Sequence, residues 1–209
     1  MYQTALQLQQ TDFTSEKETE EAVNRLKEIV MLFDGHAHKE DKFVLPAIEA
    51  YEPSVVATFQ AEHVKDEALG QQLNECIDRQ LSATTLIEKI TLGTRLTEAF
   101  IEFMVFNLEH MAKEEDIINK ILWRYYSDDE IKKISGQIVQ ATPPWMQAFY
   151  FSWMLRGISN PEAVNWMKSI EKTMPALVFQ SLLQKAEEEL TETRFRQLTS
   201  SLTEGVQLA

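Results

Sequence analysis

Apolar residues recur every three or four positions through the first two thirds of the chain, which is the spacing of one face of an α-helix. The first long stretch begins after Ser15-Glu16-Lys17-Glu18, where a serine precedes a glutamate by three residues, as at many helix N-termini. We expect this helix to reach Pro46 or slightly beyond, because a proline lacks a backbone donor and bends or ends a helix.

Two further long helices follow. Pro53 suits the first turn of the second, which we expect to end at the polar residues 82–85. The third runs to about Ser127, where another serine precedes a glutamate by three residues. With a short helical fragment over residues 1–10, these segments predict an all-α fold, an up-down four-helix bundle over residues 1–135 with a short or truncated first helix.

Residues 136–209 have a different pattern. Prolines at positions 143, 144, 161 and 175 divide this part into shorter helical pieces with broad apolar faces. We interpret it as a C-terminal helical extension whose apolar faces pack on the bundle or on each other. The alternative is that these helices form a groove for a protein partner or a second copy of the chain.

Charge and composition narrow the class of protein. Lys and Arg number 20 against 33 Asp and Glu, a net charge of −13, which disfavours binding to nucleic acid or to an anionic membrane surface. No apolar run approaches the roughly 20 residues of a membrane-spanning helix, so we expect a soluble protein. Cys76 is the single cysteine, and residues 1–30 lack the pattern of a signal peptide, so we expect a cytoplasmic location.

Histidine and glutamate share a repeated spacing. Of the 4 histidines in the chain, three have a glutamate four residues later, which places both side chains on one face of a helix. Acidic residues make up only 33 of the 209 positions, so three such pairs would seldom arise by accident. The pairs are His36 with Glu40, His63 with Glu67, and His110 with Glu114.

Each pair borders an apolar stripe, so its carboxylate is expected to face the core. Buried carboxylates are costly without a cation, and a bound metal removes that cost. Imidazole and carboxylate together suit iron, manganese or zinc, and such pairs build dinuclear sites in helical bundles. Glu67 also belongs to the charged run 65–67, typical of a solvated face, and His38 lies roughly 200° around the helix from His36. We therefore interpret His38 as a surface residue or as a support for the site.

The segment from His36 to Pro46, the dipeptide Glu62-His63 and the segment from Glu109 to Glu115 resemble, in order and spacing, the hemerythrin-like HHE cation-binding family. The resemblance covers about residues 1–135, and the extension is similar to that of a bacterial subgroup. It implies a four-helix bundle with a di-iron centre. It also implies metal ligation by His36, Glu40, His63, His110 and Glu114, with the two glutamates as bridges.

The chain departs from the family pattern at one position. Family members usually carry one more histidine on the first helix, but no histidine precedes His36 here. Residues 1–6 resemble the second half of that helix. We therefore expect either that the natural protein begins upstream or that the site lacks this ligand, which would leave one metal weakly held.

Three classes of function remain open on these grounds. The first is a non-haem iron protein that binds O₂ or a related small ligand such as NO, or that senses iron or redox state. The second is an enzyme that reduces peroxide or nitric oxide at the same centre. The third is a metal-free helical interaction scaffold. No Ser-His-Asp arrangement, glycine-rich phosphate loop or Cys-x-x-Cys motif is present, so any catalysis would depend on the metal.

Overall fold

The computed structural model describes residues 1–203 and contains α-helices, one π-helical segment and short connections over that range. By its internal contacts the chain divides into two compact units, Met1–Ile138 and the residues from Val139 onward. The expected boundary after residue 135 falls in the same helix as this division, α6 (Asp128–Ala141). The predicted all-α class, with further helices after the bundle, is confirmed.

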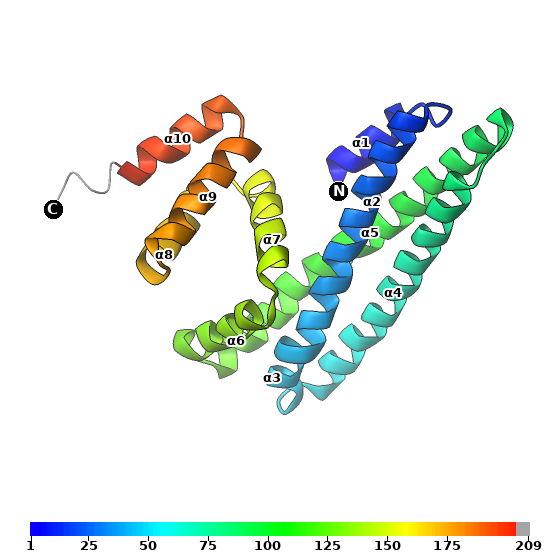
Figure 1. The fold of residues 1–209 in the computed structure, drawn as a ribbon. Helices are drawn as coiled ribbons and strands as arrows, with labels where there is room; N and C mark the ends of the chain where they lie inside the picture. Colours follow the sequence, from blue (N-terminus) through cyan, green and yellow to red (C-terminus); the bar gives the residue numbers. More distant parts are fainter. Residues whose placement is uncertain (204–209) are drawn as a thin grey trace. The chain divides into compact units, whose positions relative to one another are not determined.

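The first unit is built on three long helices in which each runs antiparallel to the next (Figure 1). They are α2 (Glu16–Lys39), α4 (Pro53–Leu81) and α5 (Leu86–Tyr125), and their bounds agree with the predicted helices. The short α1 (Tyr2–Gln10) contacts α2 and α5. The predicted bundle with a short first helix is therefore present.

Side-chain caps explain where these helices begin. The Ser15 hydroxyl accepts from the backbone N–H of Glu18. The Glu18 carboxylate accepts from the N–H of Asp12 rather than from that of Ser15, so these two residues form only half of a reciprocal capping box. Ser127 and Glu130 form the full reciprocal box at the start of α6. Each cap satisfies backbone donors that the first helical turn cannot pair.

The helix that carries His36 reaches slightly beyond Pro46, as expected, but it does so through a local irregularity. The π-helical segment η1 (Glu40–Val44) follows α2 directly and leads into α3 (Leu45–Glu49). Pro46 supplies the physical reason, because its ring conflicts with the carbonyl four residues earlier and a wider turn relieves that conflict. Wide turns of this kind occur often at functional sites.

Apolar side chains fill the first unit on both sides of one polar layer. Along α4 the buried His63 lies between the buried Phe59 and Leu69. Along α5 the buried His110 and Glu114 likewise lie between buried apolar residues. One of these apolar clusters, at the end of the unit near α3, comprises Leu45, Ile48, Val56, Phe59, Ile118, Ile121 and Leu122.

The second unit has a core of its own. Its helices are α7 (Pro144–Gly157), α8 (Asn160–Thr173), α9 (Ala176–Glu189) and α10 (Glu192–Thr203). Their apolar faces pack on each other. The buried members are Leu155, Ala163, Met167, Phe179, Leu182, Ala186, Leu190 and Leu198. No helix within residues 1–203 is both long and apolar enough to cross a membrane.

Candidate metal centre

Four side chains from three helical segments meet in the polar layer of the first unit. Glu40 comes from η1, His63 from α4, and His110 and Glu114 from α5. One nitrogen or oxygen from each lies within 4.8 Å of the others, and three of the four residues are buried. Donor atoms this close, drawn from imidazole and carboxylate, form a candidate cation site.

Each of the two carboxylates in this group lies close to two histidines, one of which is His36 in both cases. Glu40 places Oε1 3.5 Å from Nε2 of His36 and Oε2 3.4 Å from Nε2 of His63. Glu114 places Oε2 3.1 Å from the same atom of His36 and Oε1 2.6 Å from Nε2 of His110. Each glutamate therefore presents one oxygen to His36 and the other to a buried histidine. This is the arrangement that a bridging carboxylate requires.

Hydrogen bonds from neighbouring helices orient the two buried imidazoles. Nδ1 of His63 lies 2.8 Å from Oδ1 of Asp41, and Nδ1 of His110 lies 2.8 Å from Oε2 of Glu62. An ionised carboxylate can only accept, so Nδ1 carries the hydrogen in both rings. The lone pair of the neutral ring is then on Nε2, the atom that faces the centre.

Asp41 and Glu62 hydrogen-bond to candidate metal ligands, an arrangement that the sequence pattern did not reveal. Each supports a histidine on another helix, so no fixed spacing along the chain connects the partners. Glu62 is in turn held by Lys113, whose Nζ donates to Oε1 over 2.6 Å. The only local signal was that each acidic residue stands next to a predicted ligand, Glu40 or His63.

In the metal-free protein, the carboxylates and imidazoles of the centre shift one another's pKa values. Burial alone would lower the pKa of His110, but the nearby carboxylates of Glu114 and Glu62 outweigh burial and raise it to about 9. Burial would raise the pKa of Glu114, yet the imidazoles of His110 and His36 hold it well below its usual range. The pKa of Glu40 is raised, mainly by burial. Metal must therefore displace protons from this centre when it binds near neutral pH.

The hydrogen bonding of three buried atoms at the centre indicates whether its residues fit a metal ion. Oε2 of Glu40, Nε2 of His63 and Oε1 of Glu114 are buried and form no well-aligned hydrogen bond within the described part of the chain, and their close polar contacts are with one another or with Nε2 of His110. Leaving one such atom unpaired typically costs about 1–3 kcal/mol, and more when it is charged. A cation bound to all three would remove that cost, so the donor set fits a metal ion.

Aromatic rings pack on the His110 side of the centre. The ring of Phe59 packs edge-on to His110 with centroids 5.6 Å apart, and Phe106 stacks on the same imidazole at 6.0 Å. His63 and His110 are themselves 5.0 Å apart, centroid to centroid. These contacts place apolar rings directly against one of the two buried imidazoles.

Glu67 and His38 lie outside the group of four. Glu67 is exposed on α4, and its carboxylate accepts from the side-chain amide of Gln71 on the same helix. His38 is exposed on α2. Both border an open cleft of about 660 Å³ between α2 and α4, which His63 and Asp66 also line.

Asp66 is the buried acidic residue on this part of α4, with 3% of its surface exposed. Its Oδ1 accepts from the side-chain amide of Asn107 over 2.6 Å, and Asn107 is fully buried. Burial raises the pKa of Asp66, while the histidines of the centre act to lower it. The run 65–67 therefore turns its middle residue inward and Glu67 outward, a rotation that the sequence spacing did not specify.

The fold and this cluster define a helical-bundle protein with an internal cation-binding site. A family model described as the hemerythrin HHE cation-binding domain matches residues 3–122, more than half of the chain. The chain belongs to this family. No curated protein and no solved structure matches it.

Proposed function

We propose that the chain binds two non-haem iron ions at this centre, and that the loaded centre binds O₂ or a related small ligand such as NO. The observation that supports this most directly is the double contact of Glu40 and Glu114, each with one oxygen toward His36 and the other toward a buried histidine. A single ion would need only one oxygen from each glutamate.

Local charge supports the binding of cations at this centre. Glu40 and Glu114 contribute two carboxylates, and Asp41 and Glu62 add two more directly behind the imidazoles. Lys113 pairs with Glu62, so when these four carboxylates are ionised the group keeps a net negative charge that a cation bound in this largely buried layer would offset.

The residues of the chain prepare the centre for a small ligand. Asp41 and Glu62 hold the imidazoles in the tautomer that binds metal, and the aromatic rings around His110 exclude water. Bound iron would supply the redox chemistry that O₂ or NO binding requires. Zinc or manganese fits the same donors but does not provide the same reaction with O₂.

Anaerobic loading of the metal-free protein with Fe²⁺, followed by exposure to air, tests this proposal. We expect about two equivalents of bound iron, visible absorption bands of a ferric centre after oxidation, and a Mössbauer spectrum of two coupled irons. The matched control is the Glu114→Gln variant, in which the bridge is removed while size is retained. A colourless protein with less than about one equivalent of iron after loading would contradict the proposal.

A further inference from the structure

The two sides of the centre differ in their ligands. We call the inner position the space bounded by Nε2 of His63, Nε2 of His110, Oε2 of Glu40 and Oε1 of Glu114. The outer position is bounded by Nε2 of His36 and the remaining oxygens, Oε1 of Glu40 and Oε2 of Glu114. The inner position has two imidazoles, and the outer position has one.

Burial follows the same division. The side chains of His63 and His110 are 6% and 3% exposed, whereas that of His36 is 33% exposed. Water therefore competes for an ion at the outer position far more than at the inner one. An ion held by fewer protein atoms and open to solvent also dissociates faster.

The hydrogen bonds that orient the imidazoles are unequal as well. Asp41 and Glu62 fix His63 and His110, but within residues 1–203 no residue pairs with Nδ1 of His36, whose hydrogen bond is made through Nε2 to Glu114. Losing one such partner typically weakens metal binding about 10–100-fold. The outer position therefore lacks a source of affinity that both inner histidines have.

From these differences we propose that the inner position holds its metal tightly while the outer position is a weak, exchangeable site, so that the centre changes between one and two ions as free metal varies. This inference rests on the proposed function and adds a regulatory property to it. His36 becomes the residue through which the chain responds to metal availability, since it supplies the one imidazole that residues 1–203 place at the outer position.

Titration of the metal-free protein with Zn²⁺ against a chromogenic chelator tests the inference without any dependence on activity or oxygen. We expect two binding steps whose dissociation constants differ by at least about 100-fold. Gel filtration through a weak chelator should then leave one equivalent bound. Co²⁺ gives a second readout, because its absorption spectrum reports the ligands at each step.

Three variants assign the two steps to their positions. His36→Ala should abolish the weak step and leave the tight step unchanged, and His36→Gln should do the same if the alanine variant folds poorly by circular dichroism. His110→Ala should weaken the tight step. His38→Ala, which removes an exposed imidazole two residues from His36, is the matched control and should change neither step.

The outcomes separate this inference from the proposed function. Two equivalents bound with equal affinity, or a single tight equivalent that His36→Ala does not alter, would overturn the inference and leave cation binding in place. Loss of both steps in a folded His36→Ala variant would also overturn it. Failure of the wild-type protein to bind either Zn²⁺ or Fe²⁺ would instead contradict the proposed function.

Discussion

Nδ1 of His110, on α5, lies 2.8 Å from Oε2 of Glu62, on α4, and this bond joins the two longest helices at the centre. We expect Glu62→Ala to weaken the tighter metal-binding step about 10–100-fold, because the imidazole loses its orienting partner. A competition titration with Zn²⁺ measures the change. Glu67→Ala, on the exposed side of the same helix, should bind as the wild type does, and equal loss in both variants would contradict the assignment.

Glu114 is the carboxylate that contacts both His36 and His110. Replacing it with alanine should weaken metal binding more than replacing Glu67, because only Glu114 faces the centre. The metal content of both variants after identical loading and desalting gives the comparison. The reverse ranking would overturn the ligand assignment.

Metal bound only by the folded chain must stabilise it. At a free metal concentration about 100 times the dissociation constant, linkage adds about 2.7 kcal/mol to the free energy of unfolding of the first unit. Chelation should therefore lower the Tm of that unit by roughly 5–10 °C. Differential scanning calorimetry with and without chelator measures the shift, and an unchanged Tm would show that metal does not bind preferentially to the folded unit.

In the second unit, Arg156 donates to Glu189 over 2.5 Å between α7 and α9. Burial would raise the pKa of Glu189, but hydrogen bonds from Arg156 and Ser152 outweigh it and hold the pKa below the ordinary 4.5. The folded-state pKa is thus lower than the unfolded one, so the pair stabilises this unit above about pH 4.5 and loses that effect as the pH falls through the folded-state pKa.

Glu189→Gln should therefore lower the free energy of unfolding by about 1 kcal/mol at neutral pH, and by progressively less as the pH falls through the folded-state pKa and the wild-type carboxylate also becomes protonated. Urea unfolding at neutral pH and at a series of acidic pH values measures the difference. Glu188→Gln is the control, because Glu188 is exposed and its ion pair is with Lys185, which is itself exposed to solvent. A pH-independent effect of Glu189→Gln would show that shape, not charge, matters at this position.

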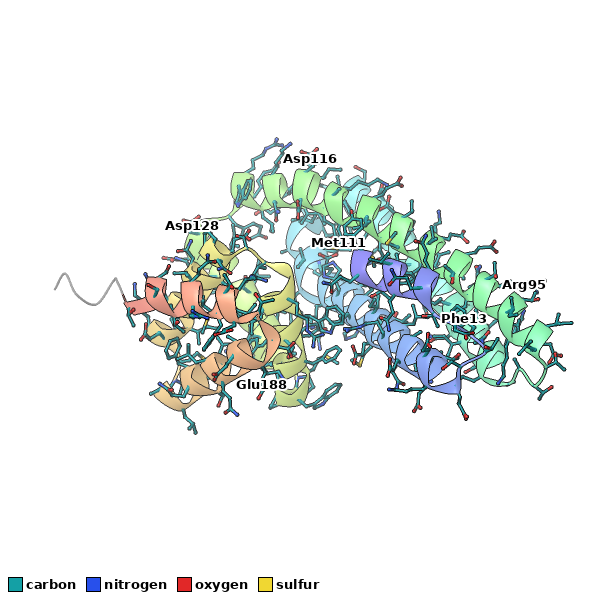
Figure 2. All side chains as sticks on the ribbon, turned by 90° about the horizontal axis from the view of Figure 1, so that it is seen from above. Phe13, Arg95, Met111, Asp116, Asp128 and Glu188 are labelled. Atoms are coloured by element: carbon teal, nitrogen blue, oxygen red, sulfur yellow. The ribbon has the colours of Figure 1, made fainter. Side chains whose placement is uncertain are left out.

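Substitution by alanine at two helical glycines of the first unit should change its stability in opposite directions. A Cβ at Gly93 would lie 2.3 Å from the ring of Phe13, which sits in the loop between α1 and α2 against α5 (Figure 2). A Cβ at Gly70 would meet its neighbours at 3.6 Å or more, an ordinary contact. We expect Gly93→Ala to destabilise the unit by about 1–3 kcal/mol and Gly70→Ala to stabilise it by about 0.5–1 kcal/mol.

Urea unfolding of the two glycine variants tests this contrast directly. Both substitutions improve helix propensity to the same degree, so propensity alone would stabilise both. A stabilised Gly93→Ala variant would show that α1 and its loop can shift away from α5 at little cost.

Much of the fold followed from local rules. Helix boundaries such as Ser15, Pro53 and Ser127 could be read because caps and prolines act within one turn of the residue concerned. The spacing of His110 and Glu114 also placed both on one face, since residues four apart are neighbours on any helix. These features depend on the backbone geometry of a single segment and on nothing else in the molecule.

The sequence by itself therefore determined the helices, the family, and which histidines and glutamates could share a face. Only the tertiary structure decided that Asp66 turns inward while Glu67 turns outward, and that Asp41 and Glu62 support histidines of other helices. The physical reason is rotation, because successive residues are about 100° apart around a helix axis and packing against the other helices sets which of them faces the core. The residue spacing within one helix does not specify how that helix is rotated about its axis relative to the core.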